Sequence, residues 1–341
     1  MDAMKGVCME FSNHADPEKV WMSGIFGLAV GDALGCPVQF RTREEMDENP
    51  VSDMTGHGTF DMPAGSWTDD TSLALATMDS ILQYKRLDLR AVMNCYAKWL
   101  LKGEYTPFGK SYDIGRGTMD AILCFLNNGF DAASCGGAEA NNNGNGSLMR
   151  ILPTCLYLLG TGTEENAAIH LVEQVSALTH AHPRSKLACG IYYNLVKVIL
   201  ETESGTDALG REFFAKVLQK GMDKAMEHYA QDVEYQKELR HYERCRDLDA
   251  LQSVKRQDIR SSGYVVDSLE AALWCAVTAK SYEEAMLLCI NLGEDTDTIA
   301  AICGGLCGLY YGFDNIPEKW RKQLARKIYI KDLCEKMAAL H

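Results

Sequence analysis

The sequence of 341 residues is 47% hydrophobic and 24% charged, which is typical of a globular protein with a sizeable core and excludes disordered and collagen-like chains. Asp and Glu number 47 against 34 Lys and Arg, so the formal net charge is −13 at pH 7. Non-specific binding to nucleic acid requires a basic surface, so we expect no direct nucleic-acid partner.

The predicted elements are helices along the whole chain. Apolar residues recur at helical spacing in many segments, and no segment shows the clear period-two alternation of a strand. The predicted helices span residues 21–34, 71–82, 89–101, 118–125, 148–159, 166–178, 185–200, 212–229, 265–279, 282–290 and 298–311. The charge-dense stretch 231–262 predicts a solvated helix and loop, or a flap. We therefore expect an all-α protein.

The sequence carries little that points to a membrane or to disulfides. It has no run of about 18 apolar residues, and its N-terminus lacks the apolar stretch of a signal peptide. The 13 cysteines are scattered through apolar segments, which favours buried thiols in a reducing compartment. We expect a cytoplasmic protein with no membrane partner.

Two acidic segments open predicted helices that lie far apart in the sequence. Residues 67–71 read Trp-Thr-Asp-Asp-Thr, and residues 294–298 read Glu-Asp-Thr-Asp-Thr. Each alone is explained by N-capping, because Asp and Thr oxygens accept the free N–H groups of a helix start. If the fold joins the two helix starts, the carboxylates repel unless a proton or cation neutralises them. Oxygen ligands without His or Cys favour Mg²⁺, Mn²⁺ or Ca²⁺.

Seven motifs follow one another between about residues 21 and 320. They are Gly27-Leu-Ala-Val-Gly-Asp-Ala-Leu-Gly35, Trp67-Thr-Asp-Asp-Thr71, Tyr112-Asp-Ile-Gly-Arg-Gly-Thr118, Gly144-Asn-Gly-Ser-Leu-Met-Arg150, Thr179-His-Ala-His-Pro-Arg184, Ser262-Gly-Tyr-Val-Val-Asp-Ser-Leu-Glu-Ala271 and Gly293-Glu-Asp-Thr-Asp-Thr298. In this order they resemble the ADP-ribosylglycohydrolase family, in particular dinitrogenase reductase-activating glycohydrolase and its bacterial relatives. The resemblance implies a compact single-domain helical bundle with a binuclear metal cleft. This domain is expected over residues 21–325, and residues 1–20 and 326–341 are expected as terminal extensions that pack on it or fray.

The resemblance also implies a metal-dependent hydrolase that releases ADP-ribose from a modified side chain of a protein, with arginine as the expected acceptor. Two Mg²⁺ or Mn²⁺ ions are expected, with the ligands Thr68, Asp69, Asp70, Asp295, Asp297 and Thr298. Asp69 or Asp70 would orient or deprotonate a water that attacks the anomeric carbon through an oxocarbenium-like transition state. Asp113 is a further catalytic candidate, and its alternative role is a helix N-cap. The family's usual state implies a monomer.

The substrate contacts implied by the resemblance lie mostly in loops. They are Asp32, Gln39, Gly115, Arg116, Gly117, Gly144, Asn145, Gly146, Ser147, Met149, His180 and Tyr264. The 144–147 loop, with the Ser147 hydroxyl, would hold the diphosphate or the distal ribose, and its alternative role is a helix cap. Tyr264 would stack on adenine or belong to the core. Asp32 would line the metal cleft from behind the ligands or simply end a helix.

Gln39 departs from the family pattern. Many relatives read Pro-Val-Glu-Phe where this chain reads Pro37-Val-Gln-Phe40, and a glutamine cannot take a proton or carry charge. This favours an arginine-type substrate over a serine-type one. Hydrolysis of serine or other O-linked conjugates, and a non-catalytic ADP-ribose-binding role, are the alternatives. A terpenoid-type synthase fits less well, because its acids lie within helices that face an apolar cavity.

Overall fold

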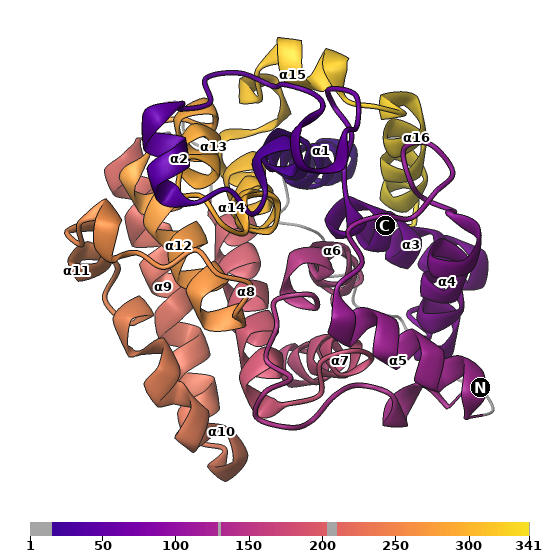
Figure 1. The fold of residues 1–341 in the computed structure, drawn as a ribbon. Helices are drawn as coiled ribbons and strands as arrows, with labels where there is room; N and C mark the ends of the chain where they lie inside the picture. The colour runs from indigo at the N-terminus through magenta and orange to yellow at the C-terminus, as the bar shows by residue number, and fades with distance from the viewer. Residues whose placement is uncertain (1–15, 129–130, 203–209, 341) are drawn as a thin grey trace.

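The computed structural model describes residues 16–128, 131–202 and 210–340 (Figure 1). Within these ranges the chain forms helices and no strand, which confirms the all-α prediction; residues 1–15 of the expected N-terminal extension lie outside them. The α-helices are α1 (Pro17–Gly35), α2 (Arg43–Glu48), α3 (Asp69–Tyr84), α4 (Leu89–Lys102), α5 (Arg116–Asn127), α6 (Leu152–Gly160), α7 (Glu165–Ala177), α8 (Pro183–Glu201), α9 (Arg211–Ala230), α10 (Val233–Leu239), α11 (Leu248–Gln252), α12 (Val265–Thr278), α13 (Tyr282–Ile290), α14 (Thr296–Tyr311), α15 (Glu318–Gln323) and α16 (Lys327–Ala338).

Helices α1 and α14 form the closely packed central pair of the fold (Figure 1). A Cβ added to Gly31 would lie 2.1 Å from the Ala300 carbonyl oxygen, and one added to Gly27 would lie 2.3 Å from that of Gly304. Only glycine permits this approach of two backbones. Because residues four apart share one helix face, the glycines of the first motif build the contact. They thereby bring Asp32 to the start of α14.

Helix α1 is long and apolar enough to cross a membrane by length and composition alone, with a mean hydropathy of 1.3. The whole of that apolar window is buried inside the protein. Helices α3, α6, α13 and α16 surround it together with α14. Its hydrophobic surface therefore belongs to the core, where a central helix is expected to be apolar all round.

Three features of the helix pattern differ from the sequence prediction. The predicted helix 148–159 is a short 3₁₀ turn, Leu148–Arg150, followed by α6, which begins near Pro153 because proline fits only the first turn. Helix α2 was not predicted, although Thr42 and Glu45 form the capping box that marks its start. Helices α15 and α16 were not predicted either, and α16 packs against α1 and α3.

The charge-dense stretch 231–262 contains α10, α11 and short 3₁₀ turns. Each of the two helices is capped by an aspartate that accepts a backbone N–H, Asp232 for α10 and Asp247 for α11. Helix α10 contacts α8 and α9, and α11 contacts α9 and α12. Helices α10 and α11 lie at one side of the molecule (Figure 1), whereas the end of the segment reaches the start of α14, where the Ser261 carbonyl oxygen accepts the Asp295 N–H at 2.9 Å.

Candidate active site

The start of α3 is capped by Asp32 of α1 and not by its own acidic residues. The Asp32 carboxylate accepts the backbone N–H groups of Thr68 and Thr71, at 2.9 and 3.0 Å, and the hydroxyl groups of both. Thr68, at the N-cap position, makes no capping bond with its side chain. Capping therefore does not account for Asp69 and Asp70, whose carboxylates are left for another role.

The start of α14 lies against the start of α3. Asp295 occupies the N-cap position of α14 without making a side-chain capping bond, and the Asp297 carboxylate accepts the backbone N–H of Thr298 at 2.9 Å. The Thr298 hydroxyl donates to Asp70 Oδ2 at 3.5 Å. The fold thus brings together the two acidic segments, although Asp70 and Thr298 lie 228 residues apart in the sequence.

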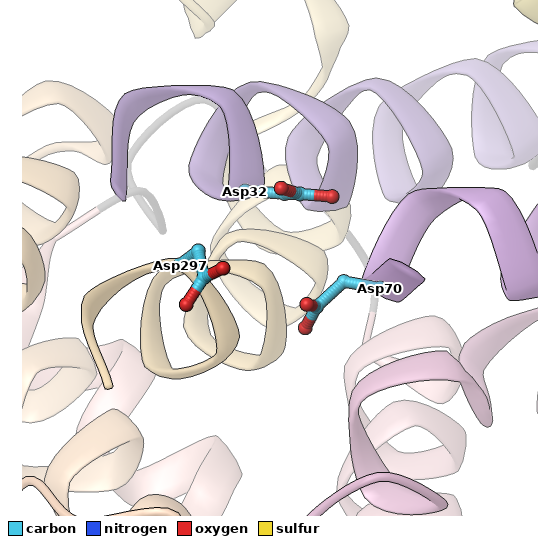
Figure 2. A group of neighbouring side chains, drawn as sticks. All are labelled: Asp32, Asp70 and Asp297. Carbon is cyan, nitrogen blue, oxygen red and sulfur yellow. The ribbon is translucent and has the colours of Figure 1, made fainter. Parts of the chain in front are cut away.

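Asp32, Asp70 and Asp297 converge from three different helices, α1, α3 and α14 (Figure 2). One carboxylate oxygen of each lies within 4.8 Å of the others, and all three residues are buried. Among the described residues, Asp70 Oδ1 and Asp297 Oδ2 are buried without a hydrogen-bond partner. We call these three residues the aspartate triad.

Burial raises the pKa of every carboxyl in the triad, to about 7 for Asp32. For Asp70 and Asp297 the neighbouring carboxylates add to the effect of burial. A buried carboxylate oxygen that has no hydrogen-bond partner requires either a proton or a cation. Since the donors are all oxygens, the aspartate triad can hold a hard metal ion.

A cavity of about 530 Å³ opens beside these helix starts. Of the residues expected from the sequence, its lining contains Gln39, Asp69, Asp113, Gly115, Arg116, Gly117, Gly144, Asn145, Gly146, Met149, His180, Asp295 and Thr298. Thr68, Asp32, Asp70, Asp297, Ser147 and Tyr264 are not part of the lining. The structure therefore gathers most of the expected substrate contacts around one cavity, with the triad next to it.

Asp295 lies at the cavity wall between two amide side chains. Its Oδ1 accepts Gln39 Nε2 at 3.3 Å, and its Oδ2 accepts Asn145 Nδ2 at 2.5 Å. Burial raises the pKa of Asp295, while the hydrogen bonds from Asn145 and Gln39 oppose the rise. A glutamate at position 39 has no N–H to donate, so the departure from the family pattern supplies a hydrogen bond that holds Asp295.

Asp113 and Asp69 are the other two carboxyl groups of the wall. Asp113 has a positive φ of 50°, and α5 is preceded by Gly115 at its N-cap, so Asp113 does not cap that helix. Burial raises the pKa of Asp113 to about 6. Asp69 Oδ2 accepts the Gly115 N–H at 3.5 Å, and burial and then Asp113 raise its pKa. The pKa of each of these two carboxyl groups is therefore higher than that of free aspartate.

Three glycines of two predicted phosphate loops converge on His180. A Cβ added to Gly117 would lie 3.1 Å from His180 Nε2, and one on Gly144 would lie 3.3 Å from the same atom. A Cβ on Gly146 would lie 2.9 Å from His180 Cε1. The space beside the imidazole exists because these residues lack side chains, and glycine backbone lines it.

Ser147 and Tyr264 lie outside the cavity lining, and Arg116 lies at its rim. The Ser147 hydroxyl is buried, where it accepts from Ser176 Oγ at 2.9 Å and from Cys189 Sγ at 3.6 Å. The Tyr264 hydroxyl accepts Arg184 Nη1 at 3.1 Å and lies outside the cavity lining. The Arg116 side chain is exposed at the rim. Hydrogen bonds within the core, which no local pattern encodes, set the direction of the Ser147 side chain.

Several lining residues were not named from the sequence. They are Phe40, Thr118, Asp120, Asn141, Asn142, Thr179 and Gly263. Most of them stand within or beside a recognised motif or the Gly- and Asn-rich loop 136–147, so proximity to a motif was the available signal. Phe40 also directly follows Gln39, and this residue is 64% exposed.

Comparisons with known proteins agree with the motif order. Residues 14–341 match the model of the ADP-ribosylglycohydrolase family. ADP-ribosylarginine hydrolase Tri1 of Serratia proteamaculans (strain 568) is 30% identical over 317 residues, which cover 92% of this chain and 77% of that protein. The protein of the same name from Pseudomonas putida (strain GB-1) is 31% identical over 315 residues, with 92% and 76% covered.

Two further matches extend over nearly the whole chain. ADP-ribosyl-[dinitrogen reductase] glycohydrolase of Rhodospirillum rubrum is 28% identical over 309 residues, which cover 90% of each protein. A solved structure described as an ADP-ribosylglycohydrolase-related protein complex superposes with a TM-score of 0.73 at 26% identity, covering 95% of this chain and 99% of its own. The agreement therefore extends from the motifs to the arrangement of the helices.

Proposed function

The chain belongs to the ADP-ribosylglycohydrolase family, and we propose that it removes ADP-ribose from an arginine side chain of a modified protein by hydrolysing the N-glycosidic bond. The observation that carries this proposal is the buried aspartate triad beside a cavity lined by further carboxyl groups and glycine loops. Two relatives at 30% and 31% identity, named ADP-ribosylarginine hydrolases, support arginine as the acceptor.

The donor set at the two helix starts fits divalent cations. Asp70 Oδ1 and Asp297 Oδ2 are buried without a partner among the described residues, and Asp32 supplies a third oxygen nearby. We assign two Mg²⁺ or Mn²⁺ ions to this region, held by the triad together with Thr68, Asp69, Asp295 and Thr298. When bound, such ions lower the pKa of a water and orient the hydroxyl groups of the substrate.

The cavity wall supplies the acid–base groups of the proposed reaction. Asp69 orients the attacking water and accepts its proton, because its carboxylate lines the cavity next to the triad. Asp113, whose pKa burial raises to about 6, carries a proton often enough near neutral pH to deliver it to the leaving nitrogen. The negative charge of this wall stabilises the positive charge that develops on the ribose in the transition state.

The cavity rim favours a cationic leaving group. Phe40 has a positive φ of 66° and its N–H donates to the Glu294 carbonyl oxygen at 2.6 Å, which holds the backbone of this lining residue next to the start of α14. The Phe60 ring supports the Phe40 ring edge-on, with 6.3 Å between ring centroids. An aromatic face next to carboxylates suits a guanidinium group better than a neutral hydroxyl.

The proposal is tested by measuring the release of free ADP-ribose from arginine-modified and serine-modified peptides, each with Mg²⁺ and with EDTA. We expect Mg²⁺-dependent release from the arginine peptide and at least tenfold slower release from the serine peptide. Faster release from the serine peptide would replace the acceptor in the proposal. Binding of ADP-ribose without release from either peptide would favour a binding protein.

We also propose that the chain acts as a monomer. The cavity and the aspartate triad are lined by residues of a single chain, so no partner copy is needed to complete the site. Light scattering on the eluted protein should give a mass near 37.8 kDa, and activity that appears only in a dimer fraction would refute this proposal.

A further inference from the structure

Arg150 is a buried cation behind the glycine loop. It is only 1% exposed, and no carboxylate of the described residues pairs with it. Its Nε donates to the Gly146 carbonyl oxygen at 2.8 Å, and its two terminal nitrogens donate to the hydroxyl groups of Tyr96 and Thr179. The guanidinium is thus held by neutral oxygens and by the Tyr96 ring, whose centroid lies 4.4 Å from its central carbon.

The direction of these hydrogen bonds determines which ring nitrogen of His180 carries the proton. Arginine can only donate, so Thr179 Oγ1 accepts from Arg150. The hydroxyl proton of Thr179 is then available for His180 Nδ1, which lies 2.8 Å away and is its one acceptor among the described contacts. His180 Nδ1 therefore accepts, and the ring proton resides on Nε2.

The surroundings of His180 keep its ring neutral. Burial, with the positive charge of Arg150 as a second cause, lowers the pKa of His180 to about 3. The residues packed on its Nε2 side are Gly117, at the start of α5, and Gly144 and Gly146 of the glycine loop. None of these glycines carries a titratable side chain. Asp69, Asp113, Arg116, Asp120 and Asp295 line the same cavity, and the lowering of the His180 pKa has burial and Arg150 as its causes.

His180 Nε2 faces a space that a ligand can reach. His180 and the three glycines Gly117, Gly144 and Gly146 all line the cavity. Thr118 lines the same space, and its Oγ1 is buried without a hydrogen-bond partner among the described residues. A Cβ on Gly146 would lie 3.1 Å from this oxygen. The imidazole N–H and the Thr118 hydroxyl therefore converge next to the glycine loop.

We propose that Arg150 is a positioning residue, which acts through Thr179 to fix His180 as a neutral Nε2–H donor for a phosphate oxygen of the substrate. Rigid donors, the Thr118 hydroxyl and an uncompensated buried positive charge all favour an anionic oxygen at this place. The inference rests on the proposed function for the presence of a diphosphate. The tautomer of His180 depends only on the hydrogen bonds within this chain.

The test combines a spectroscopic signature with ligand binding. Histidine side-chain ¹⁵N NMR of the metal-loaded protein, with His180 assigned through His180→Gln, reports which nitrogen carries the proton. Isothermal titration with ADP-ribose and with ADP, from pH 5.5 to 8, reports affinity. In the unmodified protein we expect the Nε2–H tautomer throughout and an affinity for both ligands that changes less than twofold with pH.

The informative substitutions are Thr179→Val and its matched control Thr179→Ser. Valine removes the hydroxyl while keeping the shape, so His180 should lose its fixed tautomer and ADP affinity should fall about tenfold, the equivalent of one lost hydrogen bond of about 1.4 kcal/mol. Serine should restore both readouts. An Nδ1–H or cationic His180 in the unmodified protein, or an unchanged tautomer in Thr179→Val, would overturn the inference.

The same data separate this inference from the proposed function. A fixed Nε2–H tautomer with tight binding of ADP-ribose, but no release from modified arginine, would reject the reaction and keep the positioning role of Arg150. A tautomer that responds to Thr179→Val while ADP affinity does not change would reject the phosphate contact. In both cases the comparison is repeated with Arg150→Met, which removes the cation that donates to Thr179. Circular dichroism checks that this variant folds.

Discussion

Two parts of the cavity lining, which we call the acidic end and the donor end, are built from opposite chemistry. At one end, Asp69, Asp113 and Asp295 line the wall in front of the aspartate triad. At the other end, glycine backbone and the imidazole of His180 form the wall, with Arg150 buried behind it. A substrate that is anionic at its diphosphate and becomes cationic at the bond to be broken matches both ends at once.

The two ends also differ in how the chain positions them. The acidic end depends on helix starts that the close α1–α14 contact brings together, so its carboxylates are set by the most buried part of the fold. The donor end depends on loops, pinned by isolated bridges such as Gly137 to His180 and Gly144 to Tyr264. A change in the core should therefore damage the acidic end first, and a change in a loop glycine should damage the donor end.

The largest effect is expected from Asp297→Asn. An amide removes the charge of a buried ligand while preserving its shape, so activity should fall on the order of 10³-fold, as when a major source of electrostatic stabilisation is lost. The metal-free protein should be as stable as before or more stable, because the amide removes the charge from a buried group whose Oδ2 has no hydrogen-bond partner among the described residues. Asp332→Asn, in an exposed pair with Lys336, is the control for charge. Turnover of Asp297→Asn within tenfold of the unmodified protein would contradict this assignment.

Gly31→Ala tests whether the α1–α14 contact holds the acidic end. The new methyl group would meet the Ala300 carbonyl oxygen at 2.1 Å, so urea denaturation should show a loss of about 3 kcal/mol in the free energy of unfolding, with weaker Mn²⁺ binding. Gly210→Ala, where a Cβ meets no atom within 4 Å, should change neither. Unaltered stability of Gly31→Ala would mean that the helices separate without cost.

Two neighbouring residues of one motif should respond differently at the donor end. Gly146→Ala places a methyl group 2.9 Å from the His180 ring, and ADP-ribose affinity should fall about thirtyfold, near 2 kcal/mol. Ser147→Ala removes a hydroxyl that faces Ser176 and Cys189 in the core, so affinity should change less than threefold. Isothermal titration of both variants checks this contrast, and a reversed order would place the Ser147 hydroxyl on the ligand.

The dependence of metal stabilisation on pH distinguishes protons from cations at the triad. The folded-state pKa of Asp32 is about 7, above its ordinary 3.8. Without metal, the folded protein holds a proton that the unfolded chain loses, so this contribution to stability is full below pH 3.8 and disappears towards pH 7, at about 1.4 kcal/mol per pH unit. The increase in Tm caused by Mg²⁺ should therefore be larger at pH 8 than at pH 5.5. Equal increases at both pH values would argue against this competition.

A smaller effect than that of Gly146→Ala is expected at Gln39, which holds Asp295 without belonging to the triad. Gln39→Ala should lower the rate on an arginine conjugate about tenfold or less, because it removes one hydrogen bond to a charged group. Gln39→Glu adds a carboxylate beside Asp295 and should raise the pH at which activity is half-maximal at low Mg²⁺. Steady-state rates on arginine-modified peptide check both variants; a loss of more than a hundredfold in Gln39→Ala would require a catalytic role.

The helical class and the family could be predicted from the sequence because both depend on local patterns of residues. Helical spacing identified the long helices, and the ordered motifs identified the family that the comparisons confirm. It also singled out the two acidic segments, and the structure brings them together at Asp70 and Thr298. Their meeting could only be stated as a condition, because it depends on the crossing of α1 and α14.

What the sequence did not provide is the direction of side chains and the partners of buried groups. Nothing near Asp32 in the chain indicates that it caps α3, some 36 residues later. The neighbours of Ser147 do not indicate that its hydroxyl meets Ser176. Arg150 stood in a recognised motif, but its role depends on Thr179 and Tyr96, which long-range folding brings to it.

The most direct test of the account is anomalous X-ray diffraction from crystals grown with Mn²⁺. We expect manganese peaks between the starts of α3 and α14, with a carboxylate oxygen of Asp70 and one of Asp297 at about 2.0–2.3 Å from the metal. Peaks only at other carboxylates, or none at a concentration of Mn²⁺ that supports activity, would contradict the claim that the aspartate triad is the metal centre.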